Sequence, residues 1–455
     1  MKRIMFYLLI CSIGIVPFVF ISQWASYVGV PGFGFSDVYR TPMVLIILRE
    51  ALPILFVSLV ILTHRSFFRH RCVIAIASFI FLVICSFVLV LMKSSALKLI
   101  LISAIAGIRF SMFFLLPYAI FVHFKELDLC SREKKAIFLL NAIIAILLLN
   151  FIVSLFPSRL NGVYNVNLFG IRALGITNGP NSAGALMGLI TLLLLFYRET
   201  KFRLEWIIAF ISFFGALLTG SRTGVIGTNI LLIACLCAIP MKSKSQKILL
   251  TVLIILLPYV IFNINNITRV KWCDWGKLAP VVCTAVPKAS TNLTTTSTVS
   301  LTTKSTAGKS AGFADKLLQL YRKDKIDEGA IRLRISFLKR FVDVMNVRQL
   351  LFGYGLGYGT NLATREKVYI DASRPDASIT DSLITLMLVN FGILGSICCV
   401  IIVMYFVTNL ISFWPGMIFI FYYFLFGFTQ NLVESYPTCL MFGILLGCYA
   451  VYQHL

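Results

Sequence analysis

Two segments place an arginine beside residues that expose backbone amides, a combination that suits phosphorylated ligands. Arg172 precedes the run Asn178–Asn181, and Arg222 stands in the turn Thr219–Gly224. Glycine and proline interrupt helices, and the free amides of a helix N-terminus attract anions. A guanidinium stays charged and grips phosphate oxygens bidentately. Both segments are therefore candidate anion-binding sites, with Asn181 as a further donor. A helix cap in the first and an arginine reaching lipid headgroups in the second are the alternatives.

A third segment combines Arg332 and Arg334 with the glycine-rich run Leu351–Gly359. The glycines resemble a phosphate-binding loop only superficially, because no strand precedes them and no Lys-Ser or Lys-Thr follows. We therefore expect a flexible turn that packs onto the membrane surface.

Carboxylates supply the candidate acid and base groups. Asp381 stands directly before a long apolar segment, where it either caps the helix or takes a proton from a hydroxyl group. Glu434 is a weaker candidate for the same role, or a structural residue. Glu50 and Arg109 lie inside apolar segments, where a buried ion pair is the favoured interpretation and contact of Arg109 with a lipid headgroup the alternative.

The composition requires a membrane protein. Of 455 residues, 59% are hydrophobic and 13% are charged, whereas soluble domains approach a quarter charged. The net charge of +23 lies mostly in loops between apolar segments, so nucleic acid is not an expected partner. The first apolar stretch, Ile4–Ser22, is long enough to span a bilayer and is interpreted as a transmembrane helix. No metal-ligand spacing occurs, so we predict neither a metal nor a cofactor.

Apolar runs predict an all-α polytopic protein with twelve transmembrane helices. The predicted spans are residues 4–22, 42–62, 72–92, 98–123, 136–156, 184–197, 205–219, 223–240, 248–263, 382–407, 413–429 and 435–452. Residues 1–263 thus carry nine helices with short loops, residues 264–381 form one long loop, and residues 382–455 carry three helices.

Basic residues in the short loops set the orientation. Because cytoplasmic loops are enriched in Lys and Arg, both termini and all four histidines are predicted on the cytoplasmic side. The long loop then lies outside, with a Ser/Thr-rich stretch at 290–311 and two amphipathic helices between 313 and 346. Cys273 and Cys283 share this loop, where they form a disulfide or remain two free thiols.

The motifs together resemble the O-antigen polymerase and ligase superfamily. These are Arg-x-x-Gly followed by Asn-Gly-Pro-Asn, then Leu-Thr-Gly-Ser-Arg-Thr-Gly, Arg-Leu ahead of Leu-Phe-Gly-Tyr-Gly-Leu-Gly, and a polar pair before Phe-Gly-Ile-Leu-Gly. They occur in the family's order over residues 160 to 400, on one predicted membrane face. The Thr-Gly-Ser-Arg-Thr-Gly turn is the strongest single match.

The resemblance implies a GT-C-like, metal-independent, inverting glycosyltransferase in the bacterial inner membrane, with its active site facing the periplasm. Its donor and acceptor are oligosaccharides linked to undecaprenyl diphosphate. A chain-length regulator and a flippase are the partners that it implies. Carried over by motif, Arg172, Arg222 and Arg332 hold the diphosphate, with Arg334 in place of Arg332 if the alignment shifts by two residues.

One departure from the family pattern separates two branches. Ligases usually carry a His-Asn pair where this chain has Asp381 and Ser382, and no histidine is predicted on the outer face. This favours the Wzy-type O-antigen polymerase of lipopolysaccharide biosynthesis over the ligase that transfers the glycan to lipid A-core. A lipid-linked oligosaccharide flippase is the alternative from another class. It predicts charges along a central path and pseudo-repeats, whereas the polar residues here gather at one face.

Overall fold

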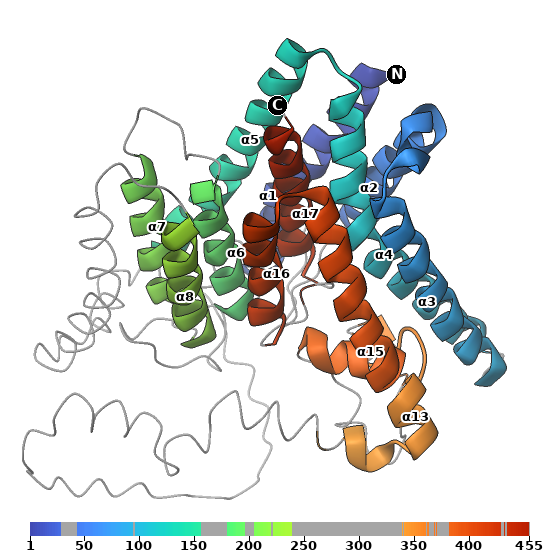
Figure 1. The fold of residues 1–455 in the computed structure, drawn as a ribbon. Helices are drawn as coiled ribbons and strands as arrows, with labels where there is room; N and C mark the ends of the chain where they lie inside the picture. Colours follow the sequence, from blue (N-terminus) through green and yellow to red (C-terminus); the bar gives the residue numbers. More distant parts are fainter. Residues whose placement is uncertain are drawn as a thin grey trace, which may run out of the picture.

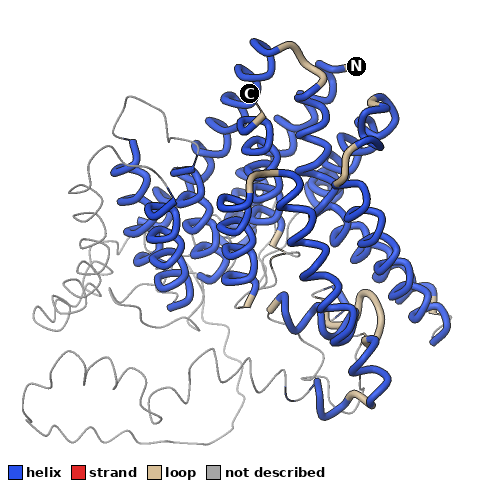
Figure 2. Tube along the Cα trace, viewed as in Figure 1, coloured by secondary structure: helices blue, strands red, loops and turns tan. Residues whose placement is uncertain are grey.

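The computed structural model describes residues 1–28, 43–93, 96–155, 180–195, 204–219, 222–238, 341–360, 382–428 and 435–454, with a few single residues between them. Within these residues the chain is helical and contains no strand (Figure 2). Six helices of this part are long and apolar enough to cross a membrane, and shorter apolar helices pack beside them. The protein is therefore an all-α polytopic membrane protein.

The N-terminal part consists of five long helices that run up and down the bundle (Figure 1). They are α1 (Lys2–Val28), α2 (Met43–Thr63), α3 (Cys72–Lys93), α4 (Leu97–Lys125) and α5 (Leu129–Leu155), with the short 3-10 helix η1 (Arg65–Arg69) between α2 and α3. Each is dominated by apolar residues, as a segment that crosses the lipid must be. Each is helical, because a helix satisfies every backbone polar group within one membrane segment.

The remaining described helices fall into two groups. The first holds α6 (Pro180–Leu192) with its 3-10 extension η2 (Leu193–Leu195), α7 (Leu204–Thr219) and α8 (Arg222–Ala238). The second holds the short α13 (Val347–Phe352), then α15 (Leu383–Leu410), α16 (Phe413–Gly427) and α17 (Tyr436–Gln453). Every predicted span overlaps a described helix, except 248–263, which lies outside the described residues.

The helix α15 departs from the predicted uninterrupted span. At Gly392 the backbone takes φ 68° and ψ −174°, so α15 is two helical pieces joined at a break. A positive φ of this kind favours glycine, because a Cβ would be strained there. The residues around the break are apolar, so the hydropathy of the sequence does not reveal that the helix is broken there.

Aromatic side chains fill the centre of the bundle around α4. The ring of Phe113 lies 4.2 Å from that of Tyr423 and 5.5 Å from that of Phe442, while Phe114 lies 5.1 Å from Phe406. Close approach of α17 to α4 depends on Gly447, where a Cβ would come 2.8 Å from the Pro117 carbonyl oxygen. Small residues at such contacts are typical of membrane helix packing.

Both chain termini lie at one end of the bundle, which we call the terminal end (Figure 1). There Lys2 Nζ donates to the Glu126 carbonyl at 2.6 Å, and the His454 ring lies 5.2 Å from that of Phe121. All four histidines lie at this end, as predicted for one side: His64 follows α2, His70 precedes α3, His123 is in the last turn of α4, and His454 follows α17. The other end, where α15 begins, is called the opposite end.

Candidate functional site

Most of the predicted site residues lie outside the described residues, and their roles stay predictions. These are Arg172, Arg332, Arg334, Asp381 and Glu434, together with Cys273 and Cys283. Two others are placed by their backbone: Asn181 is the second residue of α6, and Arg222 is the first residue of α8.

The helices α6 and α8 begin at the same end of the bundle. A Cβ on Gly188 would lie 2.7 Å from the Phe426 ring, and one on Gly227 would lie 3.1 Å from it. Gly227 lies in the second turn of α8 and Gly188 in the third turn of α6, so both helices pass Phe426, one residue before the end of α16, within three turns of their N-terminal ends. The hydrogen bond from the Tyr422 hydroxyl to the Ala185 carbonyl, 2.8 Å long, fixes α16 against the first turns of α6.

The start of α15 joins the same group. A Cβ on Gly427, the last residue of α16, would meet the Leu383 side chain at 2.9 Å, and Leu383 is the first residue of α15. Its cap is Ser382, whose hydroxyl accepts a hydrogen bond from the Thr385 amide at 3.2 Å. Because Ser382 already caps the helix, Asp381 is not required for that task.

The helices α6, α8 and α15 therefore all begin toward the C-terminal end of α16, and we call their first turns the N-terminal cluster. Each helix N-terminus carries a partial positive charge and amides without intrahelical partners. The predicted anion-binding residues Asn181 and Arg222 belong to two of these turns, and Asp381 directly precedes the third. Such a cluster can attract a diphosphate and stabilise negative charge on a leaving group.

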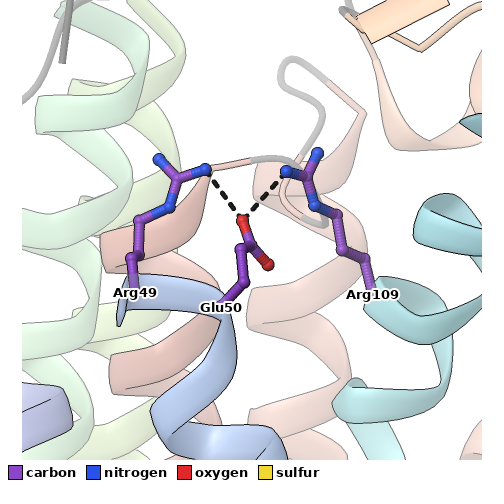
Figure 3. A network of polar contacts seen from close by, with 3 residues as sticks. All are labelled: Arg49, Glu50 and Arg109. Carbon is purple, nitrogen blue, oxygen red and sulfur yellow. Dashed lines mark hydrogen bonds and ion pairs between the residues drawn. The ribbon is translucent and has the colours of Figure 1, made fainter. Parts of the chain in front are cut away.

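The charged residues Arg49, Glu50 and Arg109 form a triad inside the membrane part (Figure 3). Glu50 Oε1 lies 2.8 Å from Arg49 Nη2 and 2.9 Å from Arg109 Nη2. The Arg49, Arg109 and Glu50 side chains are 18%, 20% and 30% exposed. The favoured sequence interpretation paired Glu50 with Arg109 alone, and the structure adds the second arginine.

The glycine-rich run is not the flexible surface turn that the sequence suggested. Residues 353 and 355–360 are buried, and the loop hydrogen-bonds to α3, α4 and α15. Gly357 N–H donates to Asn390 Oδ1 at 2.7 Å, and the Ser103 hydroxyl donates to the Leu356 carbonyl at 2.6 Å. The turn prediction failed because the loop's backbone polar groups find their partners inside the bundle.

Sequence reasoning assigned no role to Ser86, Ser103 or Asn390, although all three hold the loop. The signal was present, since a fully buried asparagine in a membrane helix is costly unless it is hydrogen-bonded. The backbone groups of the loop that Asn390 bonds, however, belong to residues more than thirty positions earlier in the chain, so the sequence does not identify them.

Comparison with known proteins gives one match. Residues 207–400 match the family model described as O-antigen ligase. The matched segment runs from α7 into α15, so it includes the start of α8, the glycine-rich loop and the break at Gly392. No curated protein and no solved structure matches the chain.

Proposed function

We propose that the protein is the polymerase of a lipid-linked O-polysaccharide. The match over residues 207–400 assigns this chain to the O-antigen polymerase and ligase superfamily. Members of this family are glycosyl-transferring enzymes, and the fold is that of a multi-pass membrane protein. The proposed reaction moves the growing glycan from undecaprenyl diphosphate onto the non-reducing end of a new lipid-linked repeat unit.

The position of the histidines is the observation that favours the polymerase over the ligase. All four lie at the terminal end, whereas α15 begins at the opposite end with Asp381 and Ser382 in the preceding residues. Ligases of the family that this chain resembles usually carry a histidine at that place. No histidine of this chain fills it, so the ligase is the second candidate.

The proposed chemistry assigns two tasks to the opposite end. Arg172, Arg222 and one of Arg332 and Arg334 hold the diphosphate, supported by the amides of the N-terminal cluster. Diphosphate is a good leaving group once its charge is stabilised, so the bond from the anomeric carbon to the phosphate oxygen breaks as the acceptor hydroxyl attacks. Asp381 orients that hydroxyl and takes its proton, with Glu434 as the alternative.

The environment follows from this assignment. The opposite end faces the periplasm of a bacterial inner membrane, where the lipid-linked substrates are presented. A flippase supplies these substrates, and a chain-length regulator acts on the same polymer.

Purified protein with lipid-linked repeat units tests the proposal. Wild type is expected to give a ladder of lengthened glycans on a gel, with and without a chelator. Arg172→Ala and Arg332→Ala should reduce turnover by about a hundredfold or more, since each removes a few kcal/mol of transition-state stabilisation. Lysine at either position should restore little, because a point charge replaces a fork.

The same assay separates the alternatives. Transfer to lipid A-core in place of lengthening would identify a ligase. Movement of the lipid-linked unit across the bilayer without any new glycosidic bond would identify a flippase. Full lengthening by both arginine variants would overturn the proposed site.

A further inference from the structure

The glycine-rich loop and the break in α15 form one interlocked structure. In the loop, Gly353, Gly355, Gly357 and Gly359 have φ of 87°, 122°, 91° and 74°, and Gly392 in α15 has φ 68°. Non-helical backbone at membrane depth persists only where protein or water satisfies its polar groups. The question is which residue supplies that satisfaction.

Asn390 makes the largest share of these contacts. Its Oδ1 accepts from Gly357 N–H at 2.7 Å, and its Nδ2 donates to the Tyr358 carbonyl at 3.1 Å and to the Leu386 carbonyl at 2.7 Å. The side chain is fully buried. One amide therefore joins two neighbouring residues of the loop to α15, which an apolar residue of similar size cannot do.

The carbonyls freed by the break are satisfied from the loop and from α3. Val389 carbonyl accepts from Tyr354 N–H at 2.7 Å, and Asn390 carbonyl accepts from the Ser86 hydroxyl at 2.6 Å. The fit is tight, since a Cβ on Gly392 would come 2.3 Å from the Leu351 carbonyl oxygen. We call this structure the clamp: residues 353–360 with Ser86, Ser103 and Asn390.

The clamp connects to the proposed site at both of its chain ends. Upstream, residues 341–352 lead from the loop toward Arg334, which stands nineteen residues before Gly353 in the sequence. On the other side, Asp381 is followed by Ser382 and then by the helical turns that lead to Asn390. The clamp thus ties the segment that carries the proposed diphosphate ligands to the helix that follows the proposed base.

We infer that Asn390 is a positioning residue of the proposed glycosyl transfer, because its amide sets the chain that leads to Arg332 and Arg334 relative to the start of α15. This inference rests on the proposed function. A displacement of about 1 Å between catalytic groups costs on the order of a hundredfold in rate. Loss of the Asn390 contacts therefore lowers turnover in a protein that is still folded.

Helix α15 contains a matched control for this residue. Asn409 Nδ2 donates to the Tyr405 carbonyl at 2.7 Å, the same bond to the preceding turn that Asn390 makes to Leu386. Asn409 is half-buried near the end of α15 and far along the helix from the loop. Asn409→Leu removes the local bond without touching the clamp.

The experiment measures kcat, KM and amide hydrogen exchange for purified wild type, Asn390→Leu, Asn390→Asp and Asn409→Leu, with the thermal midpoint of each. Asn390→Leu should lower kcat about a hundredfold, with KM little changed and faster exchange of the Gly357 amide. Asn390→Asp keeps the shape and the acceptor for Gly357 N–H, so it should recover part of the lost turnover. Asn409→Leu should match wild type in turnover and exchange.

Two results would overturn the inference. The first is a folded Asn390→Leu protein with turnover equal to that of Asn409→Leu. The second applies if Asn390→Leu does not fold: Ser103→Ala removes the hydroxyl that bonds the Leu356 and Leu99 carbonyls, and faster exchange of the loop amides with undiminished turnover would exclude a positioning role. If wild type forms no polymer while the exchange difference persists, the proposed function fails and the clamp stands as structure alone.

Discussion

The triad and the clamp solve opposite problems inside the same membrane bundle. In the triad, two arginines and a glutamate from α2 and α4 satisfy one another, and the helices that carry them stay regular around them. In the clamp, a helix is broken, and neutral side chains satisfy the backbone that the break exposes. Charge in the membrane is met by charge, and broken backbone is met by hydroxyl and amide groups.

The two regions also differ in their relation to the matched family. Glu50 and Arg109 precede residues 207–400, whereas the loop and Asn390 lie within them. The clamp further reaches out of the matched segment, because Ser86 belongs to α3 and Ser103 to α4. The N-terminal helices therefore serve as the support onto which the family segment is fixed.

The largest expected loss of stability comes from a substitution that breaks the triad. Glu50→Gln leaves the Arg49 and Arg109 guanidiniums next to each other without their shared carboxylate. Removing one partner of a buried ion pair costs about 3–5 kcal/mol, and the partial exposure of these side chains places the cost at the lower end. Denaturant unfolding in detergent micelles measures the loss.

Two comparisons sharpen this result. Glu133→Gln changes an exposed glutamate on α5 and should leave the free energy of unfolding within about 0.5 kcal/mol of wild type. Arg109→Met leaves Glu50 with Arg49 and should cost less than Glu50→Gln. Equal stability of Glu50→Gln and Glu133→Gln would mean that the triad does not hold α2 to α4.

The next effect tests the broken backbone. Gly392→Ala adds a Cβ at a positive φ and within 2.3 Å of the Leu351 carbonyl oxygen. Strain of this kind costs about 1–3 kcal/mol before the loop is displaced. Gly14→Ala is the matched control, since no atom lies within 4 Å of its Cβ position in α1, and alanine favours a helix. A Gly392→Ala protein as stable as Gly14→Ala would contradict the interlocked geometry.

A smaller effect isolates one bond of the clamp. Ser86→Ala leaves the buried Asn390 carbonyl without the hydroxyl that donates to it, at a cost of about 1–3 kcal/mol. Thr408→Val is the control, because that hydroxyl donates only to carbonyls of its own exposed helix turn. Thermal unfolding of the two variants should rank Ser86→Ala below Thr408→Val, and the reverse order would refute the assignment.

The helices could be predicted from the sequence because a membrane restricts its spanning segments to long apolar runs. Predicted spans such as 42–62 and 72–92 agree with α2 and α3 to within one residue at each end. The ion pair of Glu50 and Arg109 could be predicted for a related reason, because charged side chains inside apolar membrane segments usually pair with one another.

The clamp could not be predicted in this way. Glycines in the run 353–359 read as a flexible turn, because local sequence reports conformational freedom and not the partners that remove it. The break at Gly392 stands in an apolar run, so hydropathy cannot distinguish it from a regular turn. Its cause is the Leu351–Gly353 backbone some forty residues earlier, which occupies the space of a Cβ.

The smallest expected effect is a loss of stability at acidic pH. We expect it to arise at the terminal end and not in the triad or the clamp. Neither the triad nor the clamp contains a histidine, whereas His64 Nε2 lies 3.3 Å from His123 Nδ1 at the terminal end. Burial lowers the pKa of His64; nearby Lys2 also lowers it, and Glu126 opposes the shift. The pKa of His70 is lowered as well, first by burial and then by Lys125 and other cations.

The sign of the pH dependence follows from these shifts. A histidine whose pKa is lower in the folded protein binds its proton more tightly when unfolded, so stability is full above about pH 6.5 and declines as the pH falls below that value. Each such histidine contributes a slope of at most about 1.4 kcal/mol per pH unit. Unfolding between pH 5 and 8 should therefore show acid destabilisation that His64→Gln reduces and that Ser86→Ala leaves unchanged. An unaltered slope in His64→Gln would show that the histidine pair does not carry the acid response.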